Sequence, residues 1–227
     1  MLRDRIEQVE ARIRRAAERV GRQPEDVALI AVSKVVSSSL IRDAYAFGLR
    51  RFGENYVQEL EAKLPDLGDL TEARFHLIGH LQSNKAKRAA QIFDVVETVD
   101  SPKLARRLEE VPAELRRSGA GRLEVLLEVK LSAEEAKSGV SVEELPALVE
   151  AVRACPSLEL TGLMTMPPWS EDPEESRPYF RRLRELAERF RIPKLSMGMS
   201  HDLEVAVEEG ATEVRVGTAL FGPRAAR

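Results

Sequence analysis

Short runs of apolar residues alternate along the chain with longer stretches in which apolar residues recur every three or four positions. Runs of the first kind are typical of buried strands, and the spacing of the second kind is typical of amphipathic helices. The short runs predict eight strands, which span residues 27–33, 49–52, 75–79, 94–99, 123–130, 158–166, 194–198 and 213–217.

Helical patterns separate these strands, and several begin near Ser, Asp or Asn and end at Gly, as capped helices do. They span residues 38–48, 54–64, 83–93, 101–119, 142–155, 172–190 and 200–210. Strict alternation of strand and helix predicts a parallel sheet covered by helices, and eight strands match a (β/α)8 TIM barrel. A doubly wound open sheet is the competing topology, because alternation alone does not establish closure. We expect an α/β protein in which residues 1–227 form a single barrel domain.

The composition narrows the class of protein. The chain is 43% hydrophobic and 32% charged with a net charge of -3, which excludes a disordered chain and gives no general attraction to nucleic acid. No signal-peptide core and no run of about 20 apolar residues is present, so we expect a cytoplasmic protein outside membranes. The single cysteine, Cys155, has no intramolecular partner and precedes Pro156, which predicts a small buried or half-buried side chain, with a reactive thiol as the alternative.

The first predicted strand ends in a lysine. In the stretch LIAVSKVV, Lys34 follows four apolar residues and a serine, at the end of a strand that the barrel would bury. In a barrel the loops after the strands share one rim, and that rim carries the chemistry. Burial disfavours the charged form of a lysine, and a neutral amine is what a carbonyl needs to form a Schiff base. The alternative is a lysine that merely extends to solvent at the rim.

The last two strands predict an anion site on the same rim. Gly217 and Thr218 follow the eighth strand and open a predicted short helix, and Ser200 is the predicted N-cap of the helix that ends at Gly210. Phosphate sites after the seventh and eighth strands recur in TIM barrels. A lysine that binds an aldehyde, opposite a phosphate site, matches the layout of pyridoxal 5'-phosphate (PLP). A barrel that binds a sugar phosphate without this cofactor is the alternative.

Seven short motifs, in order, extend this interpretation over nearly the whole chain. They are AVSK (31–34), FGENYVQE (52–59), FHLIGHLQSNK (75–85), KSG (137–139), GLMTM (162–166), LSMGMS (195–200) and VRVGTALFG (214–222). Together they resemble the pyridoxal phosphate homeostasis protein family. The resemblance implies a fold type III barrel similar to the N-terminal domain of alanine racemase.

The resemblance also implies roles for individual residues. It implies that PLP is held as a Schiff base on Lys34, that Ser200 and the backbone around Gly217 and Thr218 bind the phosphate, and that Asn55 lies beside the cofactor. Two departures from the family pattern bear on rim contacts and on cofactor exchange. Many members have a threonine and a second basic residue directly after the lysine, where this chain has two valines, and often an asparagine at the position of Lys130.

Arg215 bears on catalysis. It matches the arginine that points at the pyridine nitrogen in racemase-like barrels, where a permanent positive charge disfavours the protonated pyridine that carbanion chemistry uses. Two-domain racemases take a catalytic tyrosine from a C-terminal β-domain, whereas this chain stops at Arg227 and its tyrosines, Tyr45, Tyr56 and Tyr179, lie in predicted helices. We therefore expect a monomeric PLP carrier that serves apo PLP-dependent enzymes, with a weak amino-acid racemase as the alternative.

The remaining features are a long polar loop and the three histidines. The loop at residues 167–178 opens with two prolines and the only tryptophan, and we expect it to act as a docking or gating element. The alternative is a rigid exposed loop before a helix. The three histidines, His76, His80 and His201, are expected in core or capping roles rather than in a metal site, with His201 in the first turn of a helix.

Overall fold

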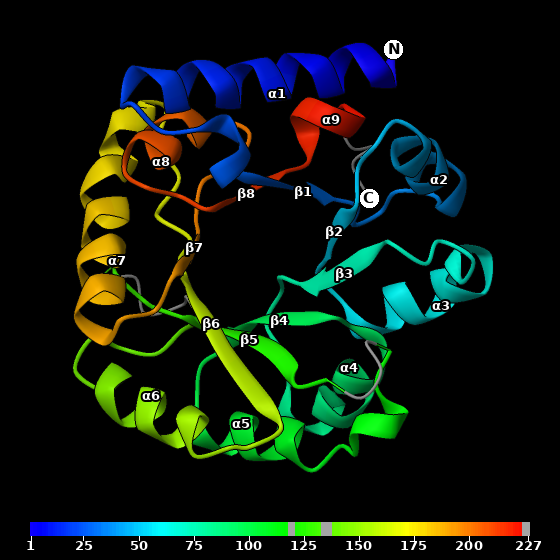
Figure 1. The fold of residues 1–227 in the computed structure, drawn as a ribbon, viewed down its shortest axis with the longest axis vertical. Helices are drawn as coiled ribbons and strands as arrows, with labels where there is room; N and C mark the ends of the chain where they lie inside the picture. The colour runs from blue at the N-terminus through cyan, green and yellow to red at the C-terminus, as the bar shows by residue number, and fades with distance from the viewer. Residues whose placement is uncertain (118–120, 133–137, 224–227) are drawn as a thin grey trace.

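The computed structural model describes residues 1–117, 121–132 and 138–223. Within these residues, parallel strands pair in chain order and the last pairs with the first, which closes a barrel (Figure 1). The strands are β1 (Ala28–Val32), β2 (Arg51–Glu54), β3 (Arg74–Leu77), β4 (Val95–Val99), β5 (Leu123–Glu128), β6 (Leu158–Met164), β7 (Lys194–Ser196) and β8 (Glu213–Val216). The predicted barrel is confirmed, and the open sheet is wrong, because β1 pairs with β8 from Ala28↔Glu213 to Ala31↔Val216.

Helices surround the strands on the outside of the barrel (Figure 1). The α-helices are α1 (Leu2–Arg19), α2 (Ser38–Ala46), α3 (Val57–Leu67), α4 (Ala86–Ile92), α5 (Pro102–Glu109), α6 (Leu145–Arg153), α7 (Arg177–Phe190), α8 (Leu203–Glu208) and α9 (Thr218–Phe221). Short 3-10 helices lie at η1 (Pro24–Asp26), η2 (Ser83–Lys85), η3 (Ala113–Leu115) and η4 (Pro173–Ser176). Each predicted helical segment therefore contains a helix, although several are shorter than the pattern.

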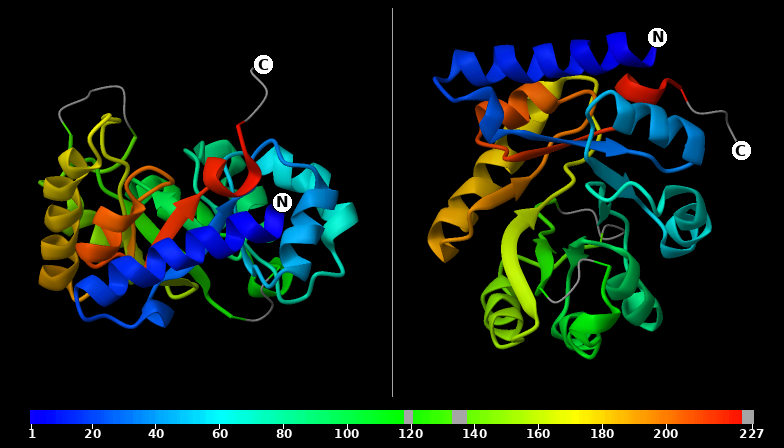
Figure 2. Two further views of the ribbon diagram at one scale, coloured as in Figure 1. Left: turned by 90° about the horizontal axis from the view of Figure 1, so that it is seen from above. Right: turned by 45° about the vertical axis from the view of Figure 1, so that its right-hand side comes forward.

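Helix α1 lies outside the junction of the first and last strands, beside α8 and α9 (Figure 2). Its buried residues recur at helical spacing on one face: Ile6, Val9, Ile13, Ala16 and Ala17. This face belongs to the main hydrophobic core, and the helix packs against α8 and α9.

Proline explains why the predicted helix at 101–119 is shorter than its pattern. Helix α5 ends at Glu109, and Pro112 follows shortly after. Proline cannot donate a backbone hydrogen bond, and it disfavours the helical conformation of the residue before it. The chain resumes only as the short helix η3, and residues 118–120 of the predicted helix lie outside the described residues.

The interior of the barrel is partly polar. A small apolar cluster of Val95, Leu126 and Met164 packs inside it, while most of the core lies between the strands and the helices. At the N-terminal ends of the strands, Glu124 accepts hydrogen bonds from Arg74 and Lys194 and forms a charged floor. The chemistry of the barrel is therefore built from buried side chains as well as from rim loops.

Two expectations from composition can be compared with the fold. Cys155 is buried, its thiol donates to Ala151 O at 3.3 Å, and burial raises the pKa of that thiol, so the predicted small buried side chain is confirmed. Among the helices of the described residues, none has both the length and the apolar character needed to cross a bilayer.

Candidate functional site

Lys34 lies in a tight turn at the C-terminal rim of the barrel. Strand β1 ends at Val32, and the turn at residues 33–36 is closed by a hydrogen bond from Val36 N to Ser33 O at 3.0 Å. Lys34 occupies the second position of this turn and is half-buried. Lys34 therefore lies in the turn after the strand and not within the sheet.

A buried network joins this turn to the next βα unit. Ser33 Oγ donates to Glu54 Oε1 at 2.7 Å. From helix α3, Lys63 Nζ donates to Ser33 O at 2.9 Å and to Glu54 Oε1 and Glu59 Oε1 at 2.8 Å each. Burial raises the pKa of Glu54, and the charge of Lys63 acts against this rise. The FGENYVQE motif therefore contacts the Lys34 turn through its two glutamates.

Asn55 directly follows β2 on the same rim. It is half-buried and lines a cavity of about 440 Å³ together with Gly79 and His80. Its backbone passes so close to Gly79 that a Cβ atom at residue 79 would lie 2.3 Å from Asn55 O. The glycine of the FHLIGH motif is thus required by the approach of two rim loops.

Arg215 is buried inside the barrel below the rim. Its Nη1 donates to Ser196 Oγ at 2.7 Å, and its Nη2 donates to Thr165 O at 2.8 Å. Burial lowers the pKa of Arg215 and the charge of Glu97 raises it again in part. Arginine side chains stay protonated in proteins, and two hydrogen bonds fix the orientation of this guanidinium.

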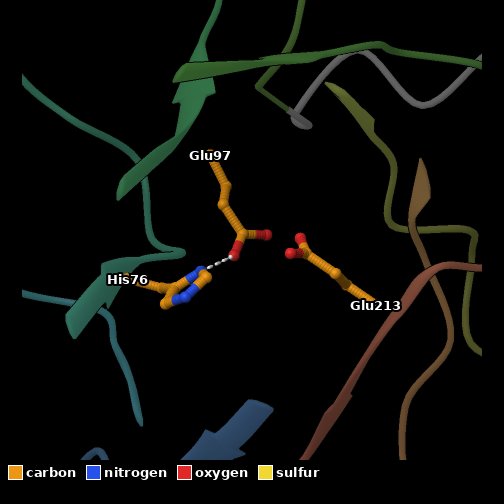
Figure 3. A group of neighbouring side chains, drawn as sticks. All are labelled: His76, Glu97 and Glu213. Atoms are coloured by element: carbon orange, nitrogen blue, oxygen red, sulfur yellow. Dashed lines mark hydrogen bonds and ion pairs between the residues drawn. The ribbon is translucent and has the colours of Figure 1, made fainter. Parts of the chain in front are cut away.

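The Arg215 bonds continue into a cluster in the middle of the barrel, which Figure 3 shows. Ser196 Oγ donates to Glu97 Oε2 at 2.5 Å, and Glu97 Oε1 lies 2.7 Å from His76 Nδ1. Burial alone would raise the pKa of Glu97, but the hydrogen bond and charge of His76, followed by Arg215, hold it below its ordinary value. Burial, reinforced by the charge of Glu97, raises the pKa of Glu213.

His76, Glu97 and Glu213 offer one ligand atom each within 4.8 Å of one another, the spacing of a metal site. Both oxygens of Glu97 already accept hydrogen bonds, however, and the buried cation Arg215 bonds to the same Ser196 hydroxyl. These contacts favour a hydrogen-bonded core network over a divalent cation. They agree with the core role expected of His76.

Ser200 does not cap helix α8, so that prediction is wrong. The helix begins at Leu203, and Asp202, the residue before it, accepts a hydrogen bond from Met199 N at 2.7 Å. This loop conformation delays the start of the helix, and Ser200 Oγ instead accepts a hydrogen bond from Ala219 N at 3.4 Å. Ser200 therefore contacts the first turn of α9, beside Thr218, rather than its own helix.

The residues after β8 form the predicted short helix, α9 (Thr218–Phe221). In the described part of the chain, the amide groups of Gly217 and Thr218 donate no hydrogen bond. Their N–H groups and the Ser200 hydroxyl thus lie on two adjoining rim loops, and β8 pairs with the strand that precedes Lys34. The structure brings these four predicted residues to one sector of the rim.

The loop at residues 167–178 covers the neighbouring sector. Its Trp169 is 75% exposed and stacks on His201 with ring centroids 6.4 Å apart, and His201 Nε2 lies 3.0 Å from Glu171 O. His201 therefore lies before helix α8. The prediction that places it in the first turn of that helix is wrong. A cavity of about 650 Å³ opens here between Trp169, Glu128 and Lys130.

His80 and the described part of the KSG motif also lie at the rim. His80 is exposed and lies 3.7 Å from Asp100, so its expected core or capping role is wrong. Lys137 of the KSG motif lies outside the described residues, whereas Ser138 donates to Glu128 Oε1 at 3.0 Å.

Residues 5–225 match the family model described as the N-terminal domain of alanine racemase. A pyridoxal phosphate homeostasis protein from Pseudomonas aeruginosa is 48% identical over 223 residues, which cover 97% of this chain and 95% of that protein. The chain belongs to the pyridoxal phosphate homeostasis protein family. The resemblance carried by the seven motifs is thereby confirmed.

Solved structures agree with this assignment. PipY from Synechococcus elongatus without PLP has a TM-score of 0.86 at 38% identity and covers 98% of this chain and 100% of its own. The same protein with PLP bound has a TM-score of 0.82 at 37% identity, with the same coverage. Alanine racemase from Corynebacterium glutamicum, at 21% identity and a TM-score of 0.67 over 94% of this chain and 60% of its own, shares the fold alone.

The candidate rim residues of this family member can be located in the sequence, whereas the side chains that bind them cannot. The network at the Lys34 turn depends on Lys63, and the one at Arg215 depends on Ser196 and Glu97. One local signal exists, because Glu59 and Lys63 are four residues apart, the spacing of an ion pair on a helix. That spacing does not reveal contact with a residue on another strand.

Proposed function

We propose that this chain binds PLP as a Schiff base on Lys34, and that it holds, buffers and delivers the cofactor without substantial catalysis. The observation that best supports the proposal is the pairing of β1 with β8, which joins the Lys34 turn to the loop of Gly217 and Thr218. The PLP-bound structure of PipY, a relative that spans the whole chain, supports the choice of ligand.

The residues in this sector fit the functional groups of PLP. The phosphate needs hydrogen-bond donors, and Gly217 N, Thr218 N and the Ser200 hydroxyl can provide them. The aldehyde needs an amine, which Lys34 carries on the adjoining turn. Asn55, at the end of the neighbouring β2, is proposed to line the same site.

Arg215 supports a carrier rather than an enzyme. When bound, PLP supplies an aldehyde for amines and a pyridine ring that withdraws electrons. The Arg215 guanidinium is already oriented by Ser196 and Thr165, and we propose that it faces the pyridine nitrogen. A fixed positive charge there keeps the nitrogen unprotonated and weakens electron withdrawal. Close relatives carry the name of homeostasis proteins rather than of enzymes, which agrees with this role.

Delivery defines the partners of the carrier. A Schiff base exchanges with incoming amines, so an apo PLP-dependent enzyme can receive the cofactor on its own lysine. We propose that the chain does this as a monomer with one domain. The loop at residues 167–178, with its exposed Trp169, is the proposed docking or gating element beside the site.

The lysine assignment can be tested by chemical trapping. The protein is loaded with PLP, reduced with borohydride and digested, and the pyridoxyl group is located by mass spectrometry. We expect it on Lys34, and we expect Lys34→Ala to lose both the label and the visible absorption band. Lys103→Ala, an exposed lysine on α5, is the matched control and should be labelled like the wild type. A fully loaded protein with unmodified Lys34 would contradict the proposal.

A weak amino-acid racemase is the second candidate, favoured by the match to the alanine racemase N-terminal domain. A racemase must remove the α-proton of an amino acid, so it should wash α-deuterium into water. The carrier proposal predicts exchange no faster than with free PLP at the same concentration. Exchange that exceeds this background and disappears in Lys34→Ala would favour the enzyme.

A further inference from the structure

Val35, directly after Lys34, has a left-handed backbone conformation. Its φ is 63°, and it occupies the third position of the turn at residues 33–36. Glycine and asparagine adopt this conformation readily, whereas for a β-branched residue it is an outlier that the surroundings must enforce. Val35 is 53% exposed, so burial of this residue does not enforce the conformation. Other contacts must hold the backbone.

The contacts that hold it come from helix α3. Glu59 Oε1 accepts a hydrogen bond from Val35 N, on the C-terminal side of Lys34. Lys63 Nζ donates to Ser33 O at 2.9 Å, on the N-terminal side of Lys34, and to Glu59 Oε1 at 2.8 Å. One ion pair on α3 therefore fixes the backbone on both sides of Lys34.

A third bond anchors this ion pair in the protein interior. Lys63 Nζ also donates to Glu54 Oε1 at 2.8 Å, and the Glu54 side chain is fully buried. An ammonium group has three donors, and these three acceptors use all of them. The Lys63 side chain is only 11% exposed, and charge-assisted bonds are strong where water is excluded. We call Lys63 with Glu54 and Glu59 the α3 clamp.

We propose that Lys63 is a positioning residue for Lys34, and that the α3 clamp sets how tightly the protein holds PLP. This inference rests on the proposed function. With the clamp in place, the turn keeps Val35 left-handed and presents Lys34 in one orientation. Without it, Val35 relaxes to a negative φ, which redirects the preceding residue and misaligns its amine. The cofactor then binds more weakly and leaves faster.

The first test replaces Lys63 by Met, which keeps the length of the side chain and removes its charge. PLP affinity is measured from the visible absorption band, and release is measured by transfer into excess apo-enzyme. The strain of a left-handed valine predicts about tenfold weaker binding and correspondingly faster release. Glu61→Ala, on the same helix, breaks the exposed pair with Arg88 and is the control, with no change expected.

A rescue variant separates positioning from general stabilisation. Glycine adopts the left-handed conformation without strain, so Val35→Gly removes the need for the clamp. We expect Val35→Gly combined with Lys63→Met to recover most of the affinity that Lys63→Met loses. A clamp that only stabilises the fold predicts no such recovery, because the two substitutions would then lower stability independently. Absence of rescue would overturn the inference.

A third variant covers the case in which Lys63→Met does not fold. Glu59→Ala removes the acceptor of Val35 N and leaves the bond between Lys63 and Glu54 in place. Glu59→Ala should weaken PLP binding, as Lys63→Met does. If borohydride fails to label Lys34 in the wild type, the proposed function is wrong. If Lys34 is labelled and both clamp variants bind PLP as the wild type does, only the positioning role is wrong.

Discussion

Glu124, in the charged floor of the barrel, allows a prediction whose size follows from its contacts. It accepts hydrogen bonds from Lys194 Nζ, from Arg74 Nη2 at 2.8 Å and from Thr161 Oγ1 at 2.9 Å. Burial acts to raise the pKa of Glu124, but these bonds, with Lys194 first, lower it from 4.5 to about 2. The prediction concerns Glu124→Gln, which keeps the shape of the side chain and removes the charge.

The lowered pKa converts into stability. A fall from 4.5 to about 2 corresponds to about 3 kcal/mol at 1.36 kcal/mol per pKa unit. The partners Arg74 and Lys194 are 43% and 34% exposed, so solvent screens the interaction and we expect about 2 kcal/mol. A carboxyl group with a lowered pKa stabilises the fold above its unfolded pKa. This stabilisation is lost as the pH falls through 4.5 towards about 2.

Urea unfolding of wild type and Glu124→Gln at pH 7, 4 and 3 measures this contribution. We expect the variant to be less stable by about 2 kcal/mol at pH 7, and by less than half of that at pH 3. Glu159→Gln is the control on the neighbouring strand, where the pair with Arg122 is exposed and spans 3.9 Å, and it should cost less than about 0.5 kcal/mol. A loss that is the same at every pH would refute the electrostatic explanation.

Two further predictions concern packing and buried charge. Gly79→Ala should lower the free energy of unfolding in urea by about 3 kcal/mol, because the new Cβ would lie 2.3 Å from Asn55 O. Gly68→Ala is the control, since its nearest contact is 3.5 Å, and it should be neutral or slightly stabilising. Glu213→Gln should raise the melting temperature at pH 7.5. Burial and the charge of Glu97 raise the pKa of Glu213 and so disfavour its charged form. A carboxyl group with a raised pKa destabilises the fold once the pH exceeds its unfolded pKa. The gain should vanish below about pH 4.5, where the group is protonated in both states, and a gain that persists there would contradict the assignment.

The strand-and-helix alternation could be predicted from the sequence because each element carries its own periodic signal. Eight βα units favour a closed barrel, but the contact that closes it joins the first strand to the last, and no local pattern specifies that contact. Elements with strong local signals can therefore be located in the sequence, but nearby residues outside the periodic pattern change their lengths. Pro112 ended one helix early, and the bond from Met199 N to Asp202 delayed another.

The site was predictable only in part, for a related reason. Lys34, Gly217 and Thr218 stand at strand ends, which a linear pattern can locate. The conformation of Val35 is enforced by residues on α3, and a pair of valines gives no sequence signal for a left-handed turn. The misassigned Ser200 had the right residue type for an N-cap, but its contact with Ala219 is made across two loops. Tertiary hydrogen bonds thus determine both the conformation of Val35 and the contact of Ser200.

The pairing of the first strand with the last also has a consequence for how the protein is made. Lys34 emerges from the ribosome long before Gly217 and Thr218, because almost the whole barrel separates them along the chain. Until β8 docks on β1, the two halves of the proposed site have no fixed distance between them. Cofactor capture at this site would therefore begin only after β8 has been synthesised and has paired with β1, and the yellow colour of a loaded protein would report a barrel that has closed.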